Sequence, residues 1–126
     1  MPRTGFVSKN APTPAGPYSH AIVAGGFVYT AGLSPHDPAT DEVVGDTIEE
    51  QTAQVMRNLL AVLAERGLNA SHLVKSTVHL QHLERDFAGF NETYKTFLVE
   101  PYPVRTTVGS TLANILVEID VVAVCE

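Results

Sequence analysis

Four polar side chains near the end of the chain have the types and spacing needed for anion binding and proton transfer. Arg105 and Thr107 are two residues apart in one β-rich stretch, and Glu118 and Asp120 repeat this spacing in the next. Because side chains alternate between the two faces of a strand, each pair shares a face. An antiparallel pairing across a loop near Leu112 would place Arg105 opposite Asp120 and Thr107 opposite Glu118. The pattern therefore predicts one cation beside two carboxylates.

This predicted cluster has two interpretations. In the first, Arg105 and Asp120 form a cross-strand ion pair that only satisfies its own charges. In the second, Arg105 presents its planar guanidinium to a substrate carboxylate, which it can bind through two parallel hydrogen bonds, and Glu118 transfers protons. The residue pattern alone leaves both open.

Three further residues each have a chemical and a structural interpretation. Tyr18 follows a Gly-Pro turn, which either aims its phenol at a cleft or leaves it in the core or at its rim. Gly32 lets the backbone approach a ligand closely, or it marks a bulge. Asn91, inside a predicted helix, contacts a ligand or only water.

Metal, thiol and phosphate chemistry lack the residues that they need. Of the five histidines, His79 and His82 are three residues apart and would point to opposite faces of a strand, while the others lie in unrelated segments. The single cysteine, Cys125, has no partner for a disulfide or a redox motif. Neither GxxxxGK nor GxGxxG occurs. We expect no metal site.

Hydrophobic periodicity predicts the elements that position these residues. The Gly25-Gly26 pair between two β-rich runs is typical of a hairpin, and the segment Ser34–Val44 has turn chemistry. Asp46 or Thr47 caps a long helix that ends near Gly67, and Thr47 with Glu50 fits a capping box. The predicted order is strand, strand, helix, strand, helix, strand, strand, at His20–Ala24, Phe27–Leu33, Thr47–Gly67, Val74–Leu83, Leu83–Leu98, Val104–Gly109 and Leu116–Val124.

This order predicts one domain over residues 1–126, with an α+β fold in which two helices pack on one face of a mixed β-sheet. Within it, Val74, Ser76, Val78 and Leu80 should share one face of a half-buried strand. Phe87, Phe90, Tyr94 and Phe97 should share one side of the second helix.

The last strand is apolar on both faces, which raises the question of what covers the second one. Residues 117, 119, 121 and 123 are apolar on one side, and Val122 and Val124 are apolar on the other. Such strands are usually buried on both faces. A chain of 126 residues has little left to cover that face, so we expect self-association.

Composition narrows the partners and the compartment. The formal charge of −6 and the pI near 5.2 disfavour nucleic acid, whose binding depends on clustered Lys and Arg, and the eight basic residues are scattered. No apolar run approaches the roughly 20 residues of a membrane helix, and residues 1–10 do not resemble a signal peptide. We expect a soluble cytoplasmic protein with no membrane partner.

Several stretches together resemble one family along nearly the whole chain. They are APTPAGPYSHAI, FVYTAG, DPATDEVVGDTIEEQTAQVMRNLLAVLAERG, LVKSTVHL, FAGFNETYKTF, PVRTTV and LVEIDVVAV. Each is weak alone, but GPYS, the EEQT…NL helix, FNETY and P-x-R-T are specific as a set. The chain resembles the RidA enamine/imine deaminases, also described as endoribonuclease L-PSP-like proteins.

The resemblance implies a homotrimer of chorismate-mutase-like fold with an active-site cleft at each subunit interface. It implies a cofactor-independent hydrolase that converts reactive enamines and imines, such as 2-aminoacrylate, 2-iminobutanoate and 2-iminopropanoate, to 2-keto acids and ammonia. Arg105 would then bind the substrate carboxylate and Glu118 would activate water. Four residues would contribute to substrate binding: Tyr18, Gly32, Asn91 and Thr107.

Two other functions remain open beside this one, and the chain departs from the family pattern. A pathway-specific deaminase would act on an aminomuconate-like enamine, and a carboxylate-binding or chaperone-like trimer would have no activity. The family's frequent TSGQ is changed at Ala31 and Leu33, its frequent cysteine is Thr107, and His20 replaces a common glutamine. These departures bear on side-chain preference, and His20 would add a titratable group near the entrance.

Overall fold

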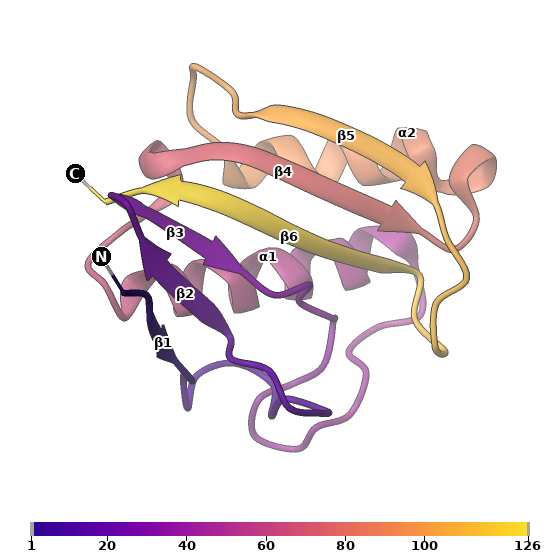
Figure 1. The fold of residues 1–126 in the computed structure, drawn as a ribbon. Helices are drawn as coiled ribbons and strands as arrows, with labels where there is room; N and C mark the ends of the chain where they lie inside the picture. Colours follow the sequence, from indigo (N-terminus) through magenta and orange to yellow (C-terminus); the bar gives the residue numbers. More distant parts are fainter. Residues whose placement is uncertain (1, 126) are drawn as a thin grey trace.

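A computed structural model, which describes residues 2–125, contains one six-stranded sheet in the order β1-β2-β3-β6-β4-β5. Both α-helices lie on the same face of it, α1 along β6 and α2 along β4 (Figure 1). This confirms the predicted α+β architecture. The bounds are β1 Thr4–Phe6, β2 Ala21–Ala24, β3 Phe27–Thr30, α1 Ile48–Ala64, β4 Leu73–Leu80, α2 Leu83–Tyr94, β5 Val104–Gly109 and β6 Val117–Val124, with short 3₁₀ turns at Ala70–His72 and Lys95–Phe97.

Local sequence signals produced the local structure that they predicted. Gly25 and Gly26 have φ of 58° and 84°, which is the double left-handed turn that a two-residue hairpin requires. Thr47 accepts a hydrogen bond from the Glu50 N–H, and the Glu50 side chain accepts one from the Thr47 N–H, so the capping box of α1 is complete. Gly67 follows that helix with a φ of 74°. Strand β1 was not predicted.

The order of the strands differs from the predicted one around β5 and β6, which carry Arg105 and Glu118. Strand β4 lies between β5 and β6, parallel to β5 and antiparallel to β6. The predicted pairing of the last two strands is therefore wrong. The two eight-residue strands, β4 and β6, bury their inner residues at the centre, whereas β5 is short and exposed at the edge, with Val104 64% accessible. Helix α2 carries the crossover that the parallel pair needs (Figure 1).

The face of Val74 and the end of the second helix also need correction. A β-bulge between Leu73 and Lys75 shifts the register of β4, so Leu73 is buried and Val74, predicted to face inward, is exposed. In α2, Phe87, Phe90 and Tyr94 share one side as predicted, since all three rings lie near Arg105, with Phe90 buried and Phe87 41% accessible. The helix ends at Tyr94 rather than Leu98, because its last turn tightens into the 3₁₀ turn.

The core lies between the helices and the inner face of the sheet, where Val117, Ile119, Val121 and Ala123 are buried as predicted. The opposite face of the sheet, which we call the open face, has no helix over it (Figure 1). Phe27, Tyr29, Val122 and Val124 lie on it in register across β3 and β6. Phe27 and Tyr29 are exposed large apolar residues. Over residues 2–125, no helix has both the length and the apolar character to cross a membrane.

Candidate functional site

Arg105 lies on the helix side of the sheet, not beside the carboxylates of β6. Its backbone neighbour on β4 is Ser76, whose hydroxyl is hydrogen-bonded to Tyr94 of α2. The Arg105 Cζ is 5.7, 5.3 and 5.2 Å from the ring centroids of Phe87, Phe90 and Tyr94. Among residues 2–125 the one ion pair joins Arg85 and Asp86. The predicted ion pair of Arg105 with Asp120 is therefore wrong, and the guanidinium is held by aromatic faces instead.

A hollow of about 410 Å³ opens beside Arg105. Asn91 lines it, so two of the residues predicted for the site come together here. Burial raises the pKa of Tyr94, with the Ser76 hydrogen bond and the Arg105 charge opposing, so its phenol stays neutral beside the cation. The full lining is Asn91, Tyr94, Lys95, Leu98, Tyr102, Pro103 and Arg105. It contains two cations and no carboxylate, which suits an anionic ligand.

Thr107 lies two residues beyond Arg105 on the same face of β5, but it does not line this hollow. Its register partner on β4 is Val78, which belongs to the core. The Thr107 hydroxyl oxygen is buried and has no hydrogen-bond partner among the described residues. A buried polar group without a partner costs free energy, so Thr107 is an unfavourable element of the single protomer.

Glu118 lies on the open face and packs against Gly32. A Cβ added to Gly32 would overlap a Glu118 carboxylate oxygen, so the missing side chain of Gly32 is what lets the carboxylate lie here. Two backbone hydrogen bonds join Leu33 and Ile119, of 2.8 and 3.2 Å, and fix the Gly32 segment alongside Glu118. The close approach predicted at Gly32 is thus made by a side chain of the protein itself.

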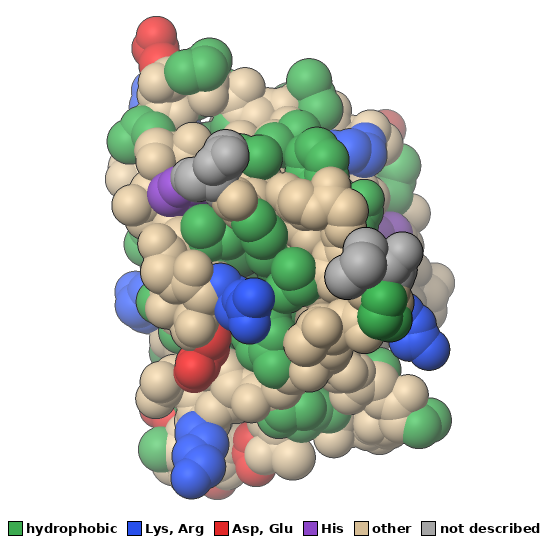
Figure 2. All heavy atoms as spheres, turned by 60° about the vertical axis from the view of Figure 1, so that its left-hand side comes forward, with side chains coloured by type: hydrophobic (Ala, Val, Ile, Leu, Met, Phe, Trp, Pro, Cys, Tyr) green, Lys and Arg blue, Asp and Glu red, His purple; other side chains and the backbone are tan. Residues whose placement is uncertain are grey.

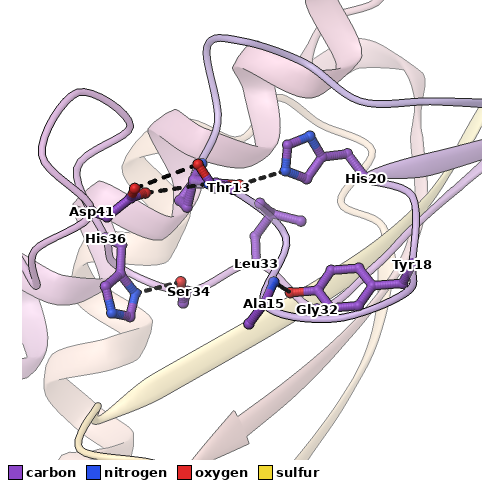
Figure 3. A pocket seen from close by; sticks show the side chains of 10 residues that line it. Thr13, Ala15, Tyr18, His20, Gly32, Leu33, Ser34, His36 and Asp41 are labelled. Atoms are coloured by element: carbon purple, nitrogen blue, oxygen red, sulfur yellow. Dashed lines mark hydrogen bonds between the residues drawn. The ribbon is translucent and has the colours of Figure 1, made fainter.

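Tyr18 also lies on this side of the molecule and is 47% accessible. Its phenol oxygen accepts a hydrogen bond of 2.9 Å from the Ala15 N–H, which folds the loop over the ring. Tyr18 and Gly32 line one end of a second hollow, of about 270 Å³ (Figure 3). Tyr18 is therefore a cavity residue rather than a core residue.

His20 is not the entrance group that the sequence suggested. Its side chain is 1% accessible, and both ring nitrogens are used. Nδ1 accepts from the Ser8 N–H at 2.8 Å, so Nε2 carries the proton and donates to the Pro12 carbonyl at 2.6 Å. His20 ties the proline-rich segment to β2, a long-range role that no local pattern indicated.

The second hollow contains polar residues that sequence reasoning assigned only to turns. Ser34, His36 and Asp41 line its far end, together with Thr13, while Leu33 lies between that end and Gly32 (Figure 3). Because these residues come from a turn-rich segment, only the tertiary structure shows that they share one cavity.

The predicted site residues therefore form two groups on opposite sides of one sheet. Arg105 and Asn91 are on the helix side at the β5 edge, while Glu118, Gly32 and Tyr18 are on the open side. Strand β4 separates β5 from β6, with Ser76 beside Arg105 and His79 beside Glu118. One protomer cannot bring the guanidinium and the Glu118 carboxylate to the same small molecule.

Other predicted features are located as follows. His82 is the N-cap of α2 and not part of β4. Within the described chain, no three His, Cys, Asp or Glu side chains gather as a metal site would require. On the face seen in Figure 2, the Lys and Arg side chains stand apart from one another. That spacing agrees with the scattered basic residues of the sequence.

Known proteins provide an independent comparison. A family model described as endoribonuclease L-PSP matches residues 8–125. A RutC family protein of Pyrococcus horikoshii is 41% identical over 118 residues, which cover 92% of this chain and 93% of the relative. The chloroplastic Reactive Intermediate Deaminase A of Arabidopsis thaliana is 36% identical over 118 residues, or 92% of this chain and 63% of the relative.

The same fold occurs in a crystal structure of RidA from an Antarctic Psychrobacter species. That structure has a TM-score of 0.90 and 32% identity to this chain, and the match covers 96% of this chain and 98% of the other. Sequence and fold thus agree with the resemblance carried by GPYS, FNETY and P-x-R-T. The chain belongs to the endoribonuclease L-PSP family, which includes the RidA proteins.

Proposed function

We propose that this protein is a cofactor-independent hydrolase that converts 2-imino acids, and the enamines from which they form, to 2-keto acids and ammonia. The observation that carries the proposal is Arg105. Its charge has no carboxylate partner among residues 2–125, and its Cζ lies over three aromatic rings. The N–H groups of a guanidinium match the two oxygens of a carboxylate, so a small acid can supply the missing partner. The deaminase name of a 36% identical relative agrees with this chemistry.

The proposed site lies between two copies of the chain. Arg105 and Glu118 are on opposite sides of the sheet, so a site that uses both needs one residue from each of two neighbours. The open face is apolar around Phe27, Tyr29, Val122 and Val124 and has no cover in one protomer. A head-to-tail ring of three copies would cover it and would create three identical clefts. We therefore propose a homotrimer with interface sites.

The reaction needs positioning and two proton transfers. An enamine such as 2-aminoacrylate first tautomerises to its imine, whose C2 is electrophilic. Arg105 holds the carboxylate, which fixes C2 against a water molecule beside Glu118 of the neighbouring copy. Glu118 takes a proton from that water as the water oxygen bonds to C2, and then donates the proton to the imine nitrogen. The hydroxyl proton of the carbinolamine then passes to the nitrogen as the C–N bond breaks, which releases ammonia and leaves the 2-keto acid. Imines already hydrolyse in water, so the protein needs only to orient and transfer protons.

One experiment tests both the chemistry and the interface. An amino-acid oxidase generates imines in situ, and their loss is timed with wild type, Arg105→Ala, Glu118→Gln, and the control Arg85→Ala, whose exposed guanidinium already has Asp86. Loss of a charge-assisted clamp should lower kcat/KM by about a hundredfold or more, with the assembly intact by sedimentation. Full activity of Arg105→Ala would remove the proposal.

Mixing the two inactive variants tests the interface. After subunit exchange, roughly a quarter of the head-to-tail interfaces would join an intact Arg105 to an intact Glu118, because each variant supplies the residue that the other lacks. Recovered activity near that fraction supports a shared site. No recovery, in mixtures shown to contain hybrid assemblies, would contradict it.

A further inference from the structure

We infer that the hollow lined by Tyr18 and Gly32 is a side-chain subsite of the proposed active site, and that it selects 2-imino acids whose side chain ends in a primary amide. This inference rests on the proposed function, because it takes the carboxylate and C2 to lie beside Glu118 and Gly32. From Gly32 the hollow runs past Leu33 to a polar end formed by Ser34, His36 and Asp41 (Figure 3). A substrate held at Gly32 would extend its side chain in that direction.

The polar end is held rigid from helix α1. Asn58 is 2% accessible, and its amide donates to the Ser34 carbonyl at 2.9 Å and to the His36 carbonyl at 2.8 Å. The Asn58 oxygen accepts a hydrogen bond of 3.0 Å from Gln54, one turn earlier. A buried amide with all of these bonds made fixes the backbone of residues 34–36. Ser34 and His36 are thereby pre-positioned before any ligand arrives.

Two residues of the polar end, His36 and Asp41, can form further hydrogen bonds with a ligand. The His36 Nδ1 is 2.7 Å from the Ser34 hydroxyl. When that hydroxyl donates, the proton of the ring is on Nε2, which becomes a donor. Among residues 2–125, the Asp41 carboxylate accepts the long contacts of 3.3 and 3.4 Å from the Thr13 N–H and hydroxyl and no shorter one. With the Ser34 hydroxyl donating to Nδ1, the hollow offers the His36 Nε2–H as a donor and Asp41, whose oxygens each keep a lone pair, as an acceptor.

A primary amide matches this pair, because its carbonyl accepts from His36 and its NH₂ donates to Asp41. Asp41 has a φ of 60°, in the left-handed region that aspartate and asparagine adopt more readily than most residues, and its N–H closes a turn onto the Asp37 carbonyl at 2.7 Å. The lining also includes Pro12, Ala15 and Leu33, which suit methylene groups. A glutamine-like side chain meets each of these requirements in order.

The test compares two substrates of nearly equal length. Glutamine and methionine are oxidised in situ, and kcat/KM is measured on each imine. A methionine side chain would leave the His36 and Asp41 groups without partners, so wild type should prefer the glutamine-derived imine at least tenfold. Asp41→Asn keeps the left-handed turn, which asparagine tolerates, but opposes one NH₂ to another. It should lower kcat/KM about tenfold for the glutamine-derived imine and leave the methionine-derived one within about twofold.

Two further variants complete the experiment. Glu42→Gln removes a neighbouring charge that does not line the hollow, and it should change neither rate. His36→Phe removes the donor without changing Asp41, and it should shift the ratio of the two kcat/KM values toward the methionine-derived imine. Equal rates on both imines, or an Asp41→Asn effect of equal size on both, would overturn the subsite while the deaminase function stands. Failure of wild type on every imine would instead overturn the proposed function.

Discussion

At the scale of single residues, the side chains around Arg105 explain how this cation can be stable without an anion beside it. Three rings of α2 lie within 6 Å of the Arg105 Cζ and replace part of its hydration. Tyr94 adds no negative charge, because burial raises the pKa of its phenol. Lys95 lines the same hollow. In a molecule with a formal charge of −6, this hollow is therefore a local positive site for a small carboxylate.

Gly32→Ala tests the contact between Gly32 and Glu118 directly. The new methyl group would occupy the position of the Glu118 carboxylate and displace it. Because a misplacement of about 1 Å can cost up to a hundredfold in rate, we expect kcat to fall about ten- to a hundredfold with little change in unfolding. The matched control is Gly16→Ala, where the nearest atoms would be 3.8 Å away. Imine turnover at the wild-type rate in Gly32→Ala would separate Glu118 from the chemistry.

At the scale of elements, His20 connects three segments that approach the proposed site. Besides its two ring contacts, its N–H donates to the Phe6 carbonyl of β1 and its carbonyl accepts from Ala31, next to Gly32. The imidazole thus sets where the proline-rich segment lies relative to Tyr18 and Gly32. This arrangement makes His20 a structural anchor of the cavity wall.

His20→Ala should therefore destabilise the fold by about 2–4 kcal/mol, because it leaves buried polar groups of Ser8 and Pro12 unpaired and opens a cavity. His20→Gln keeps one acceptor and one donor, so it should lose about 1 kcal/mol or less. Urea unfolding monitored by circular dichroism measures both. Equal losses in the two variants would contradict this account, because glutamine also refills most of the cavity that alanine opens.

The same scale separates what the sequence can predict from what it cannot. The Gly25-Gly26 turn and the Thr47–Glu50 capping box depend on contacts within a few residues, and both formed as predicted. The insertion of β4 between β5 and β6 depends on which strands can be buried on their inner face. Deciding that requires a comparison of all the strands of the chain. The predicted pairing of the last two strands assumed that strands adjacent in sequence lie side by side, so it placed Arg105 beside Asp120. The candidate site residues could be proposed from the sequence, but their separation onto the two faces of the sheet could not.

At the scale of the whole molecule, the open face is the surface that a single chain leaves uncovered. It has apolar residues on β3 and β6, and beside them a polar group in which Lys75, His79 and Asp120 surround Thr77. The apolar part favours association through burial. The polar part makes that association dependent on pH, because covering the face removes water from charged groups.

Asp120 provides the last prediction. Burial raises its pKa above 3.8, and the smaller effects of His79 and Lys75 lower it. The folded chain therefore binds this proton more tightly than the unfolded chain, so stability falls as pH rises from 3.8 through the raised pKa. A second copy over the open face would remove more water and raise that pKa further. Assembly should thus weaken as pH rises across this range, and Asp120→Asn should remove this dependence and associate more tightly than wild type at pH 7.

Sedimentation of wild type, Asp120→Asn and the exposed-surface control Glu84→Gln over a series of pH values from about 4 to 7 measures the effect. Protonation of other carboxylates lowers the net negative charge in all three proteins, so the evidence is the difference between Asp120→Asn and Glu84→Gln. If both variants follow the wild-type curve, Asp120 is not covered on assembly. The open face would then not be the surface that joins the copies, and the site shared between Arg105 and Glu118 would lose its structural basis.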